Sequence, residues 1–114
     1  MRIVVADNDP DALDLALTDL RLEGHEVFGA HDAASAHDLV VTLSPEVVVL
    51  DHRMPPGATG LELAERLAAE GRDLRIVIYS NYQALDLRAR AADLGVPFLA
   101  KGNLHALRAA VVGR

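Results

Sequence analysis

Short apolar runs alternate with stretches of helical periodicity along the whole chain. The apolar runs occupy residues 3–6, 27–30, 47–50, 76–79 and 98–100. Between them, apolar residues recur at every third or fourth position, as on one face of an amphipathic helix. Strands that alternate with helices are typical of β/α units around a parallel sheet, so the pattern predicts five such units in succession.

The order of the strands follows from how strongly each run is apolar. Strands covered by helices on both faces consist almost entirely of apolar residues, and the first, third and fourth runs fit this description better than the second and fifth. The second and fifth strands are therefore predicted at the edges. With right-handed crossovers, the result is a flavodoxin-like, doubly wound α/β fold, (βα)5, whose five parallel strands lie in the order 2-1-3-4-5. Ligands of such sheets bind at the carboxyl ends of the strands.

Length and composition narrow the classes of function. The chain has 114 residues, and we expect residues 1–114 to form one domain. No apolar run is long enough for a membrane span or a signal peptide, which favours a cytoplasmic protein without membrane partners. With 17 acidic and 11 basic residues the net charge is −6, which disfavours direct binding to nucleic acid. The absence of cysteine excludes disulfides and thiolate zinc sites.

Polar residues follow all five predicted strands, and those after the second, His31 and Asp32, lie at the far edge of the predicted sheet. Two carboxylates about 5 Å apart repel each other by roughly 3 kcal/mol at an effective dielectric of about 20, so positive charge is expected between acids that meet at the ends of these strands. A hard divalent cation with oxygen ligands, such as Mg²⁺, is the natural candidate. The residues after the other four strands are Asp7, Asn8 and Asp9 after the first strand, Asp51 after the third, Ser80 and Asn81 after the fourth, and Lys101, the only lysine of the chain, after the fifth.

The same residue types suit a phosphoryl group. The hydroxyl of Ser80 and the ammonium of Lys101 would face its oxygens, and Asp51 would accept it, because aspartate forms acyl phosphates. Each residue alone also has an ordinary structural explanation, and Asp9 is better explained as a helix N-cap. The inference therefore depends on their convergence at one end of the sheet. His52 is predicted to point away from the site if the alternation of the strand continues.

Four segments, in this order and at suitable spacing, resemble the motifs of the receiver domain of response regulators in two-component signalling. The resemblance covers essentially the whole chain. It implies a signalling phosphoacceptor rather than an enzyme. The matching segments are residues 4–10, residues 45–51 with 54–55 and 60–63 after them, residues 76–80, and residues 98–101.

The resemblance implies roles for the acidic residues. Asp51 would be the phosphoacceptor, taking its phosphoryl group from a histidine of a sensor kinase or of a phosphotransfer protein. Mg²⁺ would be bound by Asp7 and Asn8, by Asp51, and by the main-chain oxygen of Arg53.

The resemblance also implies a conformational switch. Ser80 and Lys101 would hold the phosphoryl oxygens, and Phe98 would turn inward as the Ser80 hydroxyl moves. The surface of the fourth helix, fifth strand and fifth helix would then change and control a downstream effector or self-association.

Some positions depart from the family pattern. Asn8 replaces the usual second aspartate of the acidic pair, and Gly102 replaces the usual proline after the lysine, so a trans peptide bond is expected there. Asn81 replaces the small residue that usually follows the serine, and the bulky Tyr82 comes next. Together with Arg53, these two residues are expected to flank the entrance to the site.

The departures leave a second function open, a receiver-like domain that binds a protein partner without being phosphorylated. A third alternative is a small phosphohydrolase of the haloacid-dehalogenase type, suggested by residues 7–9 and 79–81. That family needs a further acidic motif after its lysine, and residues 102–114 contain no acid, which argues against it.

Overall fold

The computed structural model describes residues 1–113 and shows five strands that alternate with five helices. Each strand begins and ends within one residue of the apolar run that predicts it. The strands are β1 (Arg2–Ala6), β2 (Glu26–Ala30), β3 (Val47–Leu50), β4 (Arg75–Ser80) and β5 (Phe98–Ala100). The helices are α1 (Pro10–Leu22), α2 (Ala33–Leu43), α3 (Gly60–Ala69), α4 (Leu85–Asp93) and α5 (Leu104–Val111).

The strands form one parallel sheet in the order β2-β1-β3-β4-β5, which confirms the predicted flavodoxin-like topology. The register brings the carboxyl ends of the strands to the same level: Ala6 pairs with Leu50, and Ser80 pairs with Ala100. The residues that follow these positions therefore emerge together at one end of the sheet.

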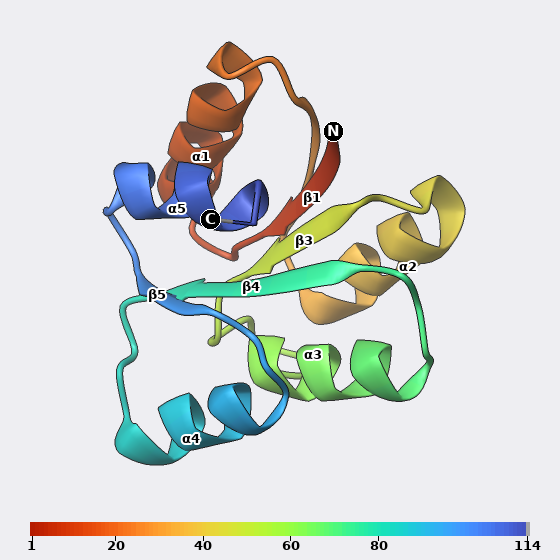
Figure 1. Cartoon of the computed structure of the whole chain (residues 1–114), viewed down its shortest axis with the longest axis vertical. Helices are drawn as coiled ribbons and strands as arrows, with labels where there is room; N and C mark the ends of the chain where they lie inside the picture. Colours follow the sequence, from red (N-terminus) through yellow and green to blue (C-terminus); the bar gives the residue numbers. More distant parts are fainter. Residues whose placement is uncertain (114) are drawn as a thin grey trace.

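Helices cover both faces of the sheet (Figure 1). Helices α1 and α5 lie on one face, and α2, α3 and α4 lie on the other. Successive strand residues point to opposite faces, so each central strand contributes to two apolar clusters. Residues Ile3, Val5, Val47, Val49, Val77 and Tyr79 pack toward α1 and α5, whereas Val4, Ala6, Val48, Leu50, Ile76 and Ile78 pack toward the other three helices.

Several helix ends are fixed by local hydrogen bonds. The Asp9 side chain accepts a hydrogen bond from the Asp11 N–H at 3.0 Å and caps α1, as predicted. Thr59 and Glu62 form a reciprocal capping box at the start of α3.

Within residues 1–113, no helix is both long and apolar enough to cross a membrane.

Candidate functional site

Three charged side chains meet at the carboxyl ends of the central strands. The Lys101 Nζ lies 2.7 Å from the Asp7 Oδ2 and 3.0 Å from the Asp51 Oδ2. Both carboxylates are buried, and Lys101 is largely covered. The positive charge expected between the two acids is therefore supplied, in this structure, by the only lysine of the chain.

Burial and charge act against each other at these residues. Burial raises the pKa of Asp7, although its hydrogen bonds with Lys101 and with the Asp9 N–H oppose the change. Burial also acts to lower the pKa of Lys101, but the hydrogen bonds and charges of Asp7 and Asp51 together outweigh it, and the pKa is raised. Lys101 therefore stays protonated, while the ionised form of Asp7 is held at a cost in free energy.

Main-chain amides orient both carboxylates. The Asp9 N–H donates to the Asp7 Oδ1 at 2.9 Å, and the His52 N–H donates to the Asp51 Oδ1 at 2.8 Å. In each carboxylate, one oxygen is thus held by the backbone and the other by Lys101. This arrangement fixes the carboxylate planes before any ligand binds.

Gly60 allows the loop after β3 to fold closely over Asp51. A Cβ atom at position 60 would lie 1.9 Å from the main-chain oxygen of Asp51, which only glycine avoids. The Gly60 N–H also donates to the main-chain oxygen of His52 at 2.8 Å. Gly60, the first residue of α3, therefore packs against the main chain of Asp51 and His52 and fixes its position.

Ser80 ends β4 beside this site and is completely covered. Its hydroxyl oxygen accepts a hydrogen bond from the Tyr82 N–H at 3.0 Å. Its main-chain oxygen accepts from the Lys101 N–H at 3.1 Å and from the Gln83 Nε2 at 2.7 Å. Ser80 is thus held by its own loop and by the residue that carries the site's ammonium.

A cleft of about 390 Å³ opens over these groups. Asn8 and the three residues predicted to flank the entrance all line it. The lining residues are Asn8, Asp9, Asp51, Arg53, Pro55, Ser80, Asn81, Tyr82 and Lys101.

Aromatic and cationic groups pack together at the rim of the cleft. The Arg53 guanidinium carbon lies 4.5 Å from the centre of the Tyr82 ring, and the His52 ring stacks on Tyr82 with centroids 5.6 Å apart. His52 is buried, does not line the cleft, and its Nδ1 has no hydrogen-bond partner among residues 1–113. Burial lowers the pKa of His52. The sequence pattern did not reveal this stack, because no short-range spacing connects residues 52 and 82.

The structure explains the glycine after the lysine. Gly102 has a φ of +97°, a conformation that favours glycine and that proline cannot adopt. Its N–H, which proline lacks, donates to the Tyr79 hydroxyl at 2.8 Å. The Lys101–Gly102 bond is trans, as expected, and the one cis bond among the described residues joins Pro55 and Pro56.

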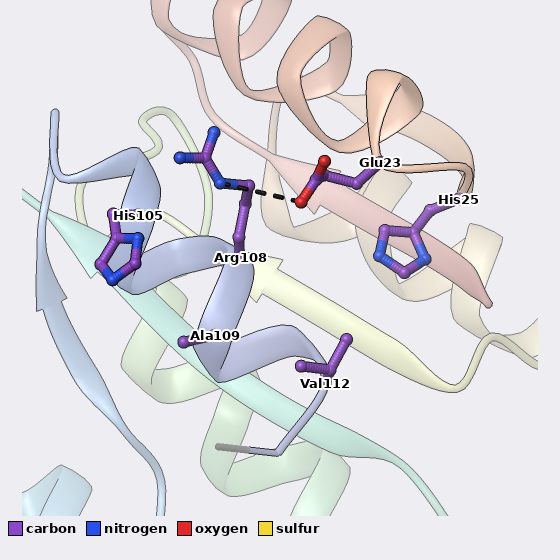
Figure 2. A pocket seen from close by; sticks show the side chains of 6 residues that line it. All are labelled: Glu23, His25, His105, Arg108, Ala109 and Val112. Carbon is purple, nitrogen blue, oxygen red and sulfur yellow. Dashed lines mark ion pairs between the residues drawn. The ribbon is translucent and has the colours of Figure 1, made fainter.

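A second hollow, of about 340 Å³, lies between the end of α1 and α5 (Figure 2). Arg108 is the one arginine or lysine that lines this hollow. Its Nη1 lies 2.7 Å from the Asp19 Oδ1, and its Nε lies 3.9 Å from the Glu23 Oε1. The charge of Arg108 is therefore balanced by these two carboxylates. His25 and His105 also line the hollow, but Figure 2 shows them on either side of Arg108 and not converging on a common point. Unlike the first site, this hollow has no lysine between two buried carboxylates.

Comparison with known proteins places the chain in a family. The response regulator receiver domain model matches residues 3–111. Response regulator MprA of Mycobacterium avium is 31% identical over 115 residues, which cover 96% of this chain and 50% of that protein, so the chain spans about half the length of the curated relatives it matches.

Solved structures agree with this assignment. The signal receiver domain of the response regulator NarL from Mycobacterium tuberculosis superposes with a TM-score of 0.87 at 29% identity, covering 99% of this chain and 97% of that one. TrrA of Thermotoga maritima, solved in complex with Mg²⁺-BeF, gives a TM-score of 0.86 at 25% identity, covering 97% and 96%. The chain belongs to the response regulator receiver domain family of two-component signalling.

Proposed function

We propose that this receiver domain accepts a phosphoryl group on Asp51 in the presence of Mg²⁺ and uses it to switch a protein-binding surface. The observation that supports the proposal most strongly is the pair of contacts from Lys101 to Asp7 and Asp51, at 2.7 and 3.0 Å. A buried nucleophilic carboxylate, a second carboxylate and an ammonium at one point are the groups that phosphoryl transfer to aspartate needs.

The donor atoms fit a hard cation. Among residues 1–113, no three acidic or histidine side chains gather to form a metal site, and the centre offers two carboxylates instead. Mg²⁺ typically takes one or two carboxylates and keeps several waters, whereas ions that prefer imidazole or thiolate find no such ligands here. We assign Asp7, Asp51, the amide oxygen of Asn8 and the main-chain oxygen of Arg53 as its ligands. When bound, Mg²⁺ would offset negative charge on the incoming phosphate.

The chain's own residues then perform distinct tasks in the transfer. A carboxylate oxygen of Asp51 attacks the phosphorus of a phosphohistidine, the bond between phosphorus and the imidazole nitrogen breaks, and the imidazole leaves with that electron pair. The His52 N–H keeps the carboxylate oriented through its 2.8 Å bond to Oδ1. Lys101 exchanges its contact with Asp51 for one with a phosphoryl oxygen, so the added charge stays paired.

Phosphorylation would be communicated through Ser80 and Phe98. The Ser80 hydroxyl now accepts from the Tyr82 N–H and still has a proton to donate to a phosphoryl oxygen. Phe98 is half-buried on edge strand β5 and packs against the core beneath α4. In the proposed switch its ring turns inward as Ser80 moves. The surface formed by α4, β5 and α5 would change in consequence and alter binding to an effector or to a second copy.

The proposal names partners by their chemistry. The donor is a phosphohistidine on a sensor kinase or phosphotransfer protein, and the recipient is a protein surface rather than nucleic acid. The Mg²⁺-BeF complex of TrrA supports a comparable site in a relative at 25% identity. We propose residues 1–114 as one such domain.

Acetyl phosphate with Mg²⁺ tests the proposal. Intact-mass spectrometry should show the gain of one phosphoryl group, which Asp51→Asn abolishes and Asp38→Asn, a change at an exposed position of α2 away from the cleft, retains. No gain in the wild type, or an equal gain in Asp51→Asn, would contradict the proposal. The first result would favour the alternative, a receiver-like interaction domain that is not phosphorylated.

A further inference from the structure

A chain of side-chain contacts connects the end of β4 to the aromatic residue of β5, outside the phosphorylation site. The Gln83 Nε2 donates to the main-chain oxygen of Ser80 at 2.7 Å. The Arg88 Nη1 donates in turn to the Gln83 Oε1. The Arg88 guanidinium carbon then lies 5.6 Å from the centre of the Phe98 ring. The two residues proposed to switch are thus joined through Gln83 and Arg88.

The chemistry of the link requires a side chain at position 83 that both donates and accepts hydrogen bonds. A main-chain carbonyl only accepts hydrogen bonds and a guanidinium only donates them, so a side chain between the two must donate at one end and accept at the other. Glutamine does both, and its partners fix which end of the amide faces which group. The Lys101 N–H shares the Ser80 carbonyl, at 3.1 Å. The Ser80 carbonyl therefore accepts one hydrogen bond from Lys101, a residue of the site, and one from Gln83.

Arg88 differs from its neighbour in what it contacts. Arg90, on the same helix, pairs with Glu65 at 2.6 Å, whereas Arg88 makes no ion pair among residues 1–113. Its contacts are with an uncharged amide and the face of an aromatic ring. A guanidinium over a ring face is attracted by the ring quadrupole, so its position depends on where Phe98 lies.

We propose that Gln83 and Arg88 form a clasp that stabilises the resting conformation of the switch and opens on phosphorylation. The inference rests on the proposed function. If Ser80 moves toward a phosphoryl group, its carbonyl leaves the Gln83 amide, and if Phe98 turns inward, its ring leaves the Arg88 guanidinium. Both movements that activate the domain therefore break the clasp, and the clasp sets how far the resting form is favoured.

Two substitutions at exposed positions test the clasp. Arg88→Met keeps an apolar stem beside Phe98 without the guanidinium, and Gln83→Glu keeps an oxygen for Arg88 but cannot donate to Ser80. Each should bind Mg²⁺-beryllofluoride about three- to tenfold more tightly than the wild type, the scale of one such contact. Arg90→Met, which breaks the ion pair with Glu65, is the matched control and should bind with wild-type affinity.

Spectra of the ligand-free protein test the contact itself. The side-chain protons of Arg88 should show ring-current shifts in the wild type, and these should decrease in Gln83→Glu. Unchanged affinity of both variants, or Arg88 signals without ring-current shifts, would overturn the clasp while leaving the proposed function intact. Failure of the wild type to bind the phosphoryl mimic would contradict the proposed function itself, and with it the role of the clasp in switching.

Discussion

At the scale of single residues, the site depends on the shape of a cation as well as on its charge. The Lys101 ammonium is compact enough to contact Asp7 and Asp51 at once, whereas a guanidinium is a broad planar fork. We therefore predict that Lys101→Arg, although it keeps the charge, weakens the affinity for Mg²⁺-beryllofluoride by about tenfold or more, the loss of one charge-assisted hydrogen bond. Titration calorimetry measures this, and wild-type affinity in the arginine variant would show that charge alone suffices.

Asp7 illustrates how function and stability oppose each other at one residue. Burial raises the pKa of Asp7, so folding disfavours its ionised form at neutral pH. Asp7→Asn should therefore increase the free energy of unfolding by about 0.5–2 kcal/mol, the usual gain when a destabilising functional residue is replaced, while it weakens Mg²⁺ binding. In urea titrations the extra stability of the variant over the wild type should shrink as the pH falls and the wild-type carboxyl takes up a proton. A variant less stable than the wild type at pH 7 would contradict this.

Arg53 and Tyr82 line the cleft over Asp51, and the Arg53 guanidinium carbon lies 4.5 Å from the centre of the Tyr82 ring. We propose that this contact limits the access of water to Asp51. Arg53→Ala should speed loss of the phosphoryl group from Asp51 by about two- to fivefold, the scale of an exposed cation–π contact. The decay of the phosphorylated mass gives the rate, with Arg21→Ala, in the last turn of α1, as the control. Equal rates in all three proteins would rule out the shielding.

The sequence predicted the convergence at the site because parallel strands bring their carboxyl ends to one edge. Asp7, Asp51 and Lys101 needed only the correct strand order to meet. The stack of His52 on Tyr82 was not predictable in this way, since it depends on the paths of two loops. The contacts of Tyr82 and Gln83 with Ser80 also depend on the path of a loop, so they could not be predicted from the strand order.

At the scale of elements, α2 and α3 are connected by an ionic cluster around Glu70. The Glu70 carboxylate contacts Arg72 at 2.7 Å, His37 of α2 at 2.9 Å and Arg66 at 3.4 Å. Its hydrogen bonds with Arg72 and then with His37 lower the pKa of Glu70 to about 2.

This cluster predicts an acid-sensitive part of the stability. Because the folded-state pKa of Glu70 lies below its ordinary value of 4.5, the stabilisation is complete above that value and is lost as the pH falls toward about 2. Glu70→Gln should be less stable than the wild type at pH 6, and the difference should vanish near pH 2. Thermal denaturation across this range measures it, and a difference independent of pH would contradict the assignment.

Elements with strong local signals were predictable, and those without were not. The buried runs of β1, β3 and β4 and the Asp9 cap of α1 are visible in the sequence, and the structure confirms them. Helix α4 begins at Leu85 with no side-chain hydrogen bond at its N-cap, Ala84, so nothing in the sequence marks its start. The position of that start determines where Arg88 lies relative to Phe98, so the clasp could not be predicted from the sequence.

At the scale of the whole molecule, the strand order places opposite ends of the chain in one site. Helices α1 and α5 on one face and α2, α3 and α4 on the other leave the carboxyl ends of the strands open (Figure 1). The proposed acceptor, Asp51, directly follows central strand β3, and Phe98 lies on edge strand β5, which is only three residues long. The fold thus combines a rigid centre that holds the charges with a less covered edge that can respond to them.

If the proposed switch operates, charge added at Asp51 moves Ser80 and Phe98. Amide NMR spectra recorded with and without beryllofluoride and Mg²⁺ detect this movement. We predict large shifts at Ser80 and Phe98 in the wild type and none of them in Asp51→Asn. Shifts confined to the residues around Asp51, with Phe98 unchanged, would contradict the proposed switch.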